Sequence, residues 1–396
     1  MKRILIVTVF LFFALAVLGA GKIVEIRVEG AQKTQSSVVA NLSGIKIGDE
    51  YDIQKIYLAK RTLQESGLFS DVYMQIREVE GGYRLIITVE EENTIYPFFG
   101  SYLALGVGDR NLLGSGVNLY GGIRFVRLSN KKILGFLPVP QLFWGGFTLG
   151  ARYPKAFGTG VDLNSEVTLF KEVPWQTDIL LTLNRFRLGG SHSIGDYGVG
   201  LSYTYENATF DASPANDYGV SILTAGLSFG DPVNYRQERA NLFGQTALNY
   251  GFGKGYSYLQ QTAQINFWYR IIGRIYASST TRVGITYSGF APVTKQFYLG
   301  GSQDLKGWNS YSFNPRHFVF QAIEAGVPLT EGFGIAPSDE LSTYIPKLYV
   351  MGAAGFEKTF GLAIGIGLEW RTPLGIAIEP QLFFGGDGFK FYFELR

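Results

Sequence analysis

The chain has 396 residues, of which 35 are basic, 33 acidic and 51 glycine, and it contains no cysteine. This length exceeds an ordinary single domain, and so much glycine disfavours a helical fold, so we expect at least two units with an all-β body. The near balance of charge argues against nucleic acid as a partner. Without disulfides, stability must come from burial and hydrogen bonding.

The first 20 residues, MKRILIVTVFLFFALAVLGA, have the pattern of a secretory signal peptide. Lys2 and Arg3 precede a run that is apolar except for Thr8 and that ends in small residues, and cleavage is expected near Ala20. A retained membrane anchor is the alternative, but an apolar run of about fifteen residues is short for crossing a bilayer. Loss of the two basic residues would leave 33 basic and 33 acidic side chains, a net charge of zero.

Residues 22–92 predict a small α+β domain with the order β-α-α-β-β. A short helix is expected in SSVVANLSG, and a second helix is expected to begin after Asp52 as its N-cap and to stop at Gly67. The apolar stripe of the second helix is predicted to consist of Ile53, Ile56, Tyr57 and Leu63. Alternating stretches predict strands at residues 24–28, 72–76 and 85–89.

This order, together with LQESGLFSDVYMQI at residues 63–76, resembles a POTRA domain. The resemblance implies that Gly67-Leu68-Phe69 turns the second helix into an edge strand that starts at Asp71-Val72. Such an edge can receive an extended client by β-augmentation. The predicted client-binding residues are Phe69, Val72, Tyr73, Met74 and Ile76.

From Thr94 onward, apolar residues alternate with small or polar ones. In GLAIGIGLEWR, residues 361–371, leucine, isoleucine and tryptophan share one face, whereas glycine, alanine and charged residues share the other. A soluble β-sandwich also alternates, but it rarely needs such runs of glycine and alanine. A transmembrane barrel requires an apolar outer face, and its closure pairs every backbone group, as lipid demands. We therefore predict an all-β transmembrane barrel over residues 95–396.

The alternation predicts about sixteen antiparallel strands, with fourteen as the alternative. Fourteen segments alternate clearly, and IYPFFGSYLALGVGD, residues 95–109, must hold one further hairpin if the chain is to start and finish on the periplasmic side. The predicted strands lie at residues 95–99, 102–108, 116–127, 141–153, 160–172, 176–188, 197–208, 217–230, 237–251, 256–271, 273–288, 316–329, 347–357, 360–372, 375–384 and 388–396.

Between the eleventh and twelfth predicted strands, residues 297–313 read FYLGGSQDLKGWNSYSF, which fits neither a strand nor a simple hairpin turn. This loop resembles a motif of the superfamily of outer-membrane assembly factors and two-partner secretion translocators, to which the BamA-type insertases belong. Matches at DRNLLGSG, GDPVNYRQ, AIEAGVPL and GLEWRTPLG extend the resemblance over essentially the whole mature chain. The residues of the loop motif are Gly300, Gly301, Leu305, Lys306, Gly307 and Trp308.

The resemblance implies that the loop folds back into the barrel and that its basic residue pairs with a carboxylate on the lumen wall. Here that residue is Lys306, and Glu324 is the expected partner. Lysine offers a point charge where the family has the planar fork of arginine, and Met351 and Gly352 stand where the family has an aspartate. A weaker or rerouted latch is therefore implied. A solvent-exposed loop without lumen contacts is the alternative.

The resemblance also implies a function, which is to fold client β-barrels into the outer membrane of a diderm bacterium or a derived organelle, with the POTRA domain in the periplasm. The partners would be unfolded outer-membrane protein clients and the lipid bilayer, with room for accessory assembly subunits, and no cofactor is implied. The first strand contains Pro97, which lacks a donor, so a lateral seam is expected between the first and last strands. The predicted seam residues are Ile95, Phe99, Phe391, Tyr392 and Phe393.

Two other functions stay open, a translocator that exports a partner polypeptide through the lumen and a passive porin. Catalysis is not expected, because the GxSxG match at residues 226–230 has no following helix to form a nucleophile elbow. The only histidines, His192 and His317, are too far apart in sequence to suggest a metal site. Glu324, Glu369 and Arg371 are interpreted as lumen-facing charges.

Overall fold

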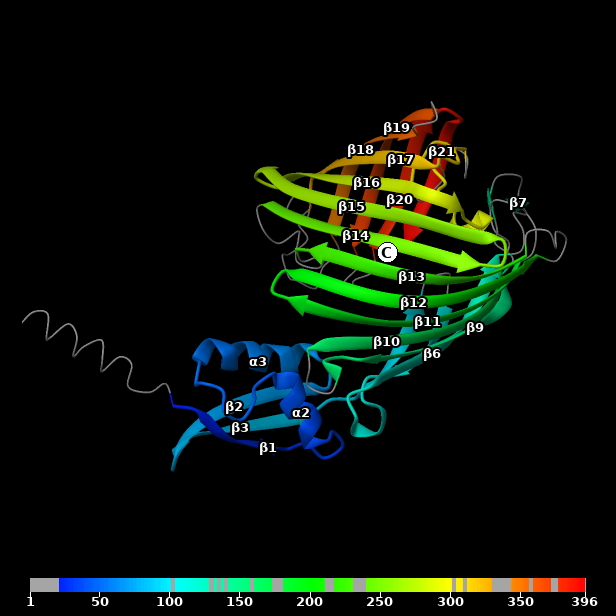
Figure 1. Cartoon of the computed structure of the whole chain (residues 1–396). Helices are drawn as coiled ribbons and strands as arrows, with labels where there is room; N and C mark the ends of the chain where they lie inside the picture. The colour runs from blue at the N-terminus through cyan, green and yellow to red at the C-terminus, as the bar shows by residue number, and fades with distance from the viewer. Residues whose placement is uncertain are drawn as a thin grey trace, which may run out of the picture. The chain divides into compact units, whose positions relative to one another are not determined.

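The chain folds as two compact units in a computed structural model (Figure 1). The first unit combines Met1–Phe125 with Phe147–Glu166, and the second combines Val126–Gly146 with Val167–Arg396. The predicted signal peptide lies outside the described residues. The first unit contains the small domain and the first strands of the large sheet. The structure describes residues 21–100, 104–127, 132–133, 137–138, 142–156, 160–172, 181–210, 217–230, 240–300, 304–308, 312–329, 343–355, 359–371 and 377–395.

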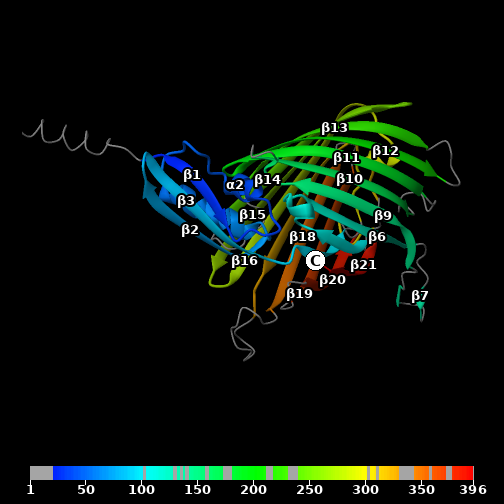
Figure 2. The ribbon, with the colours of Figure 1, turned by 90° about the horizontal axis from the view of Figure 1, so that it is seen from below.

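The small α+β domain has the predicted order. Its elements are β1 (Ile23–Glu29), α2 (Ser36–Ser43), α3 (Ile53–Glu65), β2 (Phe69–Val79) and β3 (Gly82–Glu91). The sheet order is β1-β3-β2, with β1 parallel and β2 antiparallel to β3 (Figure 2). Strand β2 is therefore an edge of this sheet.

The ends of the helices follow the sequence signals. The Asp52 side chain accepts a hydrogen bond from the Gln54 N–H at 2.8 Å and caps α3. Gly44, with φ of 70°, ends α2, and Gly67, with φ of 67°, lets the chain turn from α3 into β2. These are left-handed conformations that glycine adopts without steric cost.

The predicted apolar stripe of α3 is half wrong. Leu63 is fully buried and Ile56 packs against the core, but Ile53 and Tyr57 are 68% and 70% exposed. Ile56, Ala59 and Leu63 lie on the buried face of the helix. At 3.6 residues per turn, Ile53 and Tyr57 fall outside this face.

The second sheet has sixteen strands among the described residues, antiparallel and arranged in chain order from β4 to β21. The fold class predicted from the sequence, a β-barrel of about sixteen strands preceded by one small α+β domain, is confirmed. A separate two-stranded sheet consists of β7 (Lys132–Ile133) and β8 (Leu137–Pro138). The sixteen strands are β4 (Ile95–Gly100), β5 (Ala104–Asp109), β6 (Asn118–Arg127), β9 (Leu142–Tyr153), β10 (Val161–Glu172), β11 (Leu181–Ile194), β12 (Tyr197–Phe210), β13 (Tyr218–Phe229), β14 (Ala240–Gly253), β15 (Tyr256–Ile272), β16 (Ile275–Phe290), β17 (His317–Gly326), β18 (Thr343–Gly355), β19 (Thr359–Arg371), β20 (Ala377–Gly385) and β21 (Gly388–Leu395).

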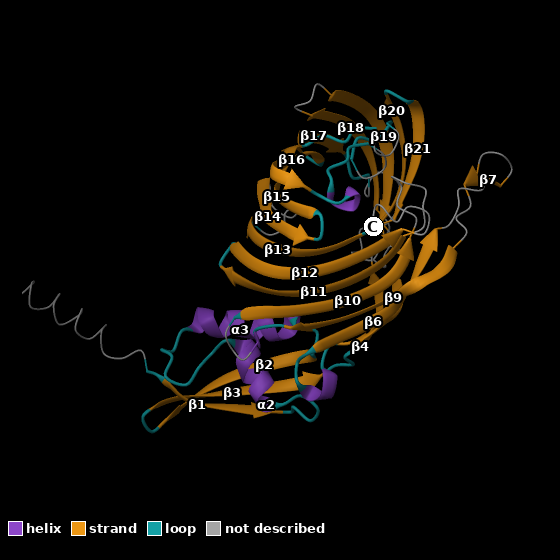
Figure 3. Ribbon diagram, turned by 45° about the vertical axis from the view of Figure 1, so that its right-hand side comes forward, coloured by secondary structure: helices purple, strands orange, loops and turns teal. Residues whose placement is uncertain are grey.

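Side chains alternate between the two faces of the strands, as β19 illustrates. Leu362, Ile364 and Ile366 are exposed, whereas Ala363 and Gly365 between them are buried. An exposed face of this kind is the face that a transmembrane barrel presents to lipid. Within the second unit the strands curve, and the loop between β16 and β17 lies on their concave side (Figure 3). None of the helices in the described part of the chain is long and apolar enough to cross a membrane.

One strand prediction is wrong at its C-terminal end. The expected strand 176–188 corresponds to β11, which continues to Ile194. Gly189 and Gly190, which lie beyond the end of the predicted strand, pair with Ser202 and Leu201 inside the β11–β12 ladder. The turn comes at Gly195, with φ of 58°, because antiparallel pairing continues until a residue leaves the extended region.

Candidate functional site: the loop between β16 and β17

The loop between β16 and β17, residues 291–316, is here called the lumen loop. Its first described part contains the short helix η4 (Val293–Lys295). The Lys295 ammonium lies 2.8 Å from Glu206 on β12, and the Tyr218 hydroxyl of β13 donates to the same carboxylate at 2.6 Å. Tyr218 also contacts the Thr294 hydroxyl, and Arg185 pairs with Glu206 at 2.8 Å. We call this set the first anchor of the loop.

Sequence reasoning missed the first anchor. Glu206 is fully buried, and burying an ionised carboxylate is costly unless it is paired and hydrogen-bonded. The two cations and the tyrosine satisfy it here. The sequence signal was a glutamate at an inward position of an alternating strand, with a lysine near the start of the loop. The pairing of Glu206 with Lys295 could not be predicted without the register of the strands.

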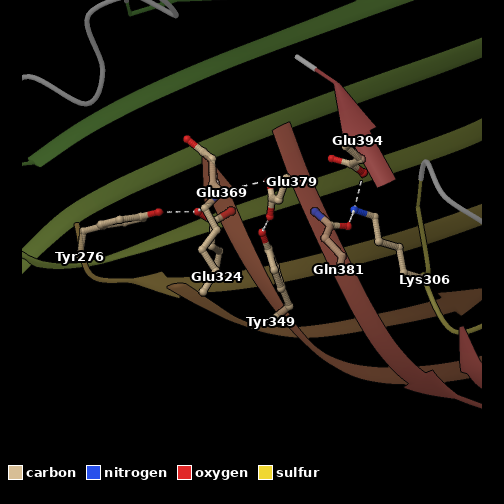
Figure 4. Close-up of polar contacts among 9 residues, drawn as sticks. Tyr276, Lys306, Glu324, Tyr349, Glu369, Glu379, Gln381 and Glu394 are labelled. Carbon is tan, nitrogen blue, oxygen red and sulfur yellow. Dashed lines mark hydrogen bonds and ion pairs between the residues drawn. The ribbon is translucent and has the colours of Figure 1, made fainter. Parts of the chain in front are cut away.

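Lys306 forms the second anchor. Its ammonium donates to the Gln381 side-chain oxygen on β20 and to Glu394 on β21 (Figure 4). The amino group also lies 5.3 Å from the ring centre of Phe383 and 6.0 Å from that of Tyr392. Lys306 is 5% exposed, so the carboxylate and the ring faces together replace the water that its charge loses.

Backbone contacts hold the residue that follows. The Gly307 N–H donates to the Tyr392 hydroxyl at 3.1 Å, and the Asp387 N–H donates to the Gly307 carbonyl at 3.3 Å. Gly307 has φ of 86°, and a Cβ there would lie 2.8 Å from the Gly385 nitrogen. Only glycine allows both this conformation and this close approach of two backbones.

Further contacts tie the same segment to β16 and β19. Asp304 forms an ion pair with Arg282 of β16. The Trp308 indole N–H donates to the Leu362 carbonyl of β19 at 2.9 Å, and its ring packs against Phe313 with centroids 5.0 Å apart. Leu305 is fully buried. Two residues of the predicted motif remain: Gly300 has φ of 116°, and Gly301 lies outside the described residues.

The expected pairing of Lys306 with Glu324 is wrong. Glu324 accepts a hydrogen bond from the Tyr276 hydroxyl at 2.7 Å (Figure 4). It also lies 3.2 Å from the Lys347 ammonium. The physical reason is the docking of Gly307 against Gly385, which places Lys306 beside β20 and β21 rather than β17.

Lys347 is the centre of a second charged cluster on the inner face. Its fully buried ammonium pairs with Glu324, with Glu369 and, at 3.4 Å, with Glu379. The Tyr349 hydroxyl donates to Glu379. The sequence predicted inward positions for the first two glutamates, but it did not identify Lys347 as their shared partner. The cluster joins β17, β18, β19 and β20 through one ammonium group.

The predicted seam residues lie on the terminal strands. Ile95, Phe391 and Phe393 are 64%, 67% and 60% exposed, so they belong to the apolar outer face. Tyr392 alternates with them and points inward to the lumen loop. Phe99 pairs with Leu105 in the β4–β5 ladder, and its side chain lies outside the described residues.

The predicted client-binding residues divide between the two faces of β2. Phe69 and Val72 are buried in the core, and Met74 and Ile76 pack against it. Tyr73 is exposed, with the Lys60 ammonium 5.8 Å from its ring centre. The unpaired backbone edge and Tyr73 are therefore the parts of this strand that an incoming chain can reach.

Comparison with known proteins agrees with this architecture. Residues 21–92 match the POTRA family, described as "Surface antigen variable number repeat". The comparison with curated proteins gives no match. Among solved structures, the chain is similar to BamA from Haemophilus ducreyi lacking POTRA domains 1-3, with a TM-score of 0.67 and 14% identity over 95% of this chain and 84% of that one.

Two further solved structures have the same fold. CdiB from Acinetobacter baumannii has a TM-score of 0.65 and 12% identity, covering 95% of this chain and 73% of that one. CdiB from Escherichia coli has a TM-score of 0.63 and 13% identity, covering 95% and 76%. At these identities the likeness establishes the fold. Residues 21–92 thus match a POTRA domain, and the chain as a whole has the fold of the BamA and CdiB structures, in agreement with the architecture that the sequence predicted.

Proposed function

We propose that this protein is an outer-membrane β-barrel assembly factor. In this proposal it receives client strands on the β2 edge of its periplasmic POTRA domain and inserts them into lipid through a lateral seam between β4 and β21. It acts without a nucleotide or another cofactor, since client folding into the bilayer is itself favourable through burial of apolar side chains. The observation that carries the proposal is the edge of β4 on which the backbone nitrogen of Pro97 lies.

Pro97 weakens one particular edge of β4. The ladder from β4 to β5 runs without a gap through the pair Pro97–Val107. A proline that faced β5 would remove a bond from this ladder, because it has no N–H to donate. Its missing donor therefore lies on the opposite edge of β4, which is the edge a neighbour would use to close the barrel. A strand paired there gains fewer backbone bonds than elsewhere.

The lengths of the terminal strands point in the same direction. As described, β4 has 6 residues and β21 has 8, whereas β15 and β16 have 17 and 16. The number of possible ladder bonds scales with the length of the shorter partner, and each contributes about 1 kcal/mol net. The pairings of β5 with β4 and β6 are equally short, with 6 and 5 pairs, so length alone does not single out the terminal seam. The missing Pro97 donor weakens that seam further, so we expect it to open first and to offer a backbone edge to a client strand.

The POTRA contacts with a client are proposed to be weak. An extended client segment would pair with the free backbone of β2 and pack on the exposed ring of Tyr73, while the buried Phe69 and Val72 hold the strand in place. A few net backbone bonds give an affinity low enough for release. Substitution Tyr73→Ala should weaken binding of a client peptide more than Gln75→Ala, at another exposed position of the same strand.

Export of a polypeptide through the lumen is the second candidate, and the similarity to CdiB favours it. The anchors of the lumen loop support insertion instead, because Glu206 on β12 and Glu394 on β21 fasten the loop at two places on the concave face. An exported chain would have to displace both anchors.

Reconstitution distinguishes the two functions. The full chain is placed in liposomes, and a urea-unfolded β-barrel client is added on the POTRA side. Assembly activity predicts faster appearance of folded, heat-modifiable client in the bilayer. A client polypeptide that reaches the liposome side opposite the POTRA domain without membrane insertion would instead support export. Liposomes without the protein serve as the control.

A further inference from the structure

We propose that β20 and β21 form a hairpin that moves as one body, with its joint at Pro380, and that residues 304–308 of the lumen loop hold it in place as a strap. This inference rests on the proposed lateral seam and deepens it. It assigns Pro380, Lys306 and Tyr392 as positioning residues for opening.

The ladder between β19 and β20 is interrupted. Residues 364–367 pair with residues 384–381, and residues 370–371 pair with residues 378–377, but the two positions between them form no ladder pair. Pro380 lies in this gap opposite Leu368, and its ring nitrogen cannot donate to that residue. Both missing pairs, 368–380 and 369–379, would require a hydrogen bond donated by the nitrogen of residue 380.

The hairpin itself is continuous. The β20–β21 ladder runs without a gap from the pair Ile378–Leu395 to the pair Gly385–Gly388. Pro380 pairs with Phe393 inside it, so the proline removes nothing on this side. The hairpin is thus more completely bonded within itself than to β19, which is the condition for it to move as a unit.

The strap spans the interrupted ladder. On one side, Lys306 and Gly307 bond to the hairpin at Gln381, Tyr392 and Glu394. On the other side, Asp304 pairs with Arg282 of β16, and the Trp308 indole donates to Leu362 of β19. Five consecutive loop residues therefore connect the hairpin to the fixed part of the wall without using the β19–β20 ladder. Their release leaves the weakened ladder as the main backbone connection.

Two matched pairs of residues allow a specific test. Lys306 and Lys295 are both loop lysines paired with inner-face glutamates, but Lys306 pairs with Glu394 of the hairpin, whereas Lys295 pairs with Glu206 of β12. Pro380 and Pro346 are both strand prolines, but the β18–β19 ladder is intact through Pro346, whose carbonyl accepts from Val327. Its missing donor therefore faces away from β19. Valine restores an N–H at either site and suits a strand.

The experiment measures amide hydrogen exchange by mass spectrometry on the full chain in lipid nanodiscs. Lys306→Met should speed exchange in residues 377–395 by about tenfold or more, because charge-assisted bonds are lost, while exchange in residues 240–290 stays within about twofold. Adding Pro380→Val should return most of the protection, and adding Pro346→Val should not. Lys295→Met alone should leave residues 377–395 unchanged. Tyr392→Phe removes only the acceptor of the Gly307 N–H and provides a milder second variant with the same direction of change.

The inference is overturned if Lys306→Met and Tyr392→Phe leave hairpin exchange unchanged, if exchange rises equally across the barrel, or if Pro346→Val protects as well as Pro380→Val. Client insertion into liposomes is measured on the same variants and tests the assembly function separately from the hairpin motion. If hairpin exchange speeds up as expected while client insertion stays unchanged, the joint at Pro380 is supported and the assembly function is contradicted.

Discussion

The buried ammonium of Lys347 gives the largest stability effect that the structure predicts. Lys347→Met keeps the length of the side chain but removes the ammonium that Glu324, Glu369 and Glu379 share. Removal of one partner from a buried ionic cluster typically costs about 3–5 kcal/mol, because the remaining charges stay buried after losing their counter-charge. The exposed Lys254, in the turn between β14 and β15, provides the control, and Lys254→Met should change stability by less than about 0.5 kcal/mol.

The assay is urea unfolding of the full chain in lipid vesicles, followed by tryptophan fluorescence and by heat-modifiable migration in gels. A second variant, Lys347→Met with Glu379→Gln, should recover part of the loss, since it removes one of the uncompensated carboxylates. If Lys347→Met unfolds within about 1 kcal/mol of the wild type, the reasoning is refuted. Water would then be reaching the cluster and screening its charges.

Three other predictions concern the loop and the POTRA domain. Gly307→Ala should destabilise the barrel by about 1–3 kcal/mol in thermal melts, because the added Cβ strains the backbone and pushes it away from Gly385. The control Gly255→Ala, at φ of 79° with open space around it, should cost only the backbone strain. Equal losses in the two variants would contradict the close approach of Gly307 to Gly385. Burial opposes ionisation of Glu91, but hydrogen bonds from the backbone N–H groups of Thr34 and Lys33 outweigh burial and lower the pKa of Glu91 below 4.5. The ionised Glu91 therefore stabilises the fold above pH 4.5, and this stabilisation is lost as the pH falls through the folded-state pKa. Thermal melts of the full chain should lose this acid sensitivity in Glu91→Gln, and an unchanged pH profile would contradict the assignment. Asp52→Ala should cost about 1 kcal/mol of POTRA stability and speed amide exchange in the first turn of α3, while unchanged exchange there would exclude the cap.

The strands could be predicted because the two faces of each strand meet different solvents. An outer face in lipid and a crowded inner face impose a period of two, so Leu362, Ile364 and Ile366 identify β19 without any knowledge of its neighbours. The POTRA elements could be predicted because Asp52 and Gly67 mark helix ends by local chemistry alone.

The partners within the site could not be predicted, because they depend on strand register. Glu324 and Glu394 are both inner-face glutamates, and only the contact between Gly307 and Gly385 decides which one lies near Lys306. The same limit applies to Lys347, whose three partners come from three strands. The predicted end of β11 was wrong for a different reason. Glycine is disfavoured inside strands in general, but Gly189 and Gly190 lie inside the β11–β12 ladder.

A disulfide across the proposed seam tests whether clients leave the barrel between β4 and β21. Cysteine pairs are scanned between residues 95–99 of β4 and residues 391–393 of β21 in the full chain, which has no native thiol to interfere. A pair that crosslinks on oxidation is then assayed for client insertion into liposomes before and after reduction. We expect the crosslinked protein to lose most of its insertion activity and to regain it when the disulfide is reduced. Equal insertion by the locked and reduced forms would contradict lateral opening as the route of client release.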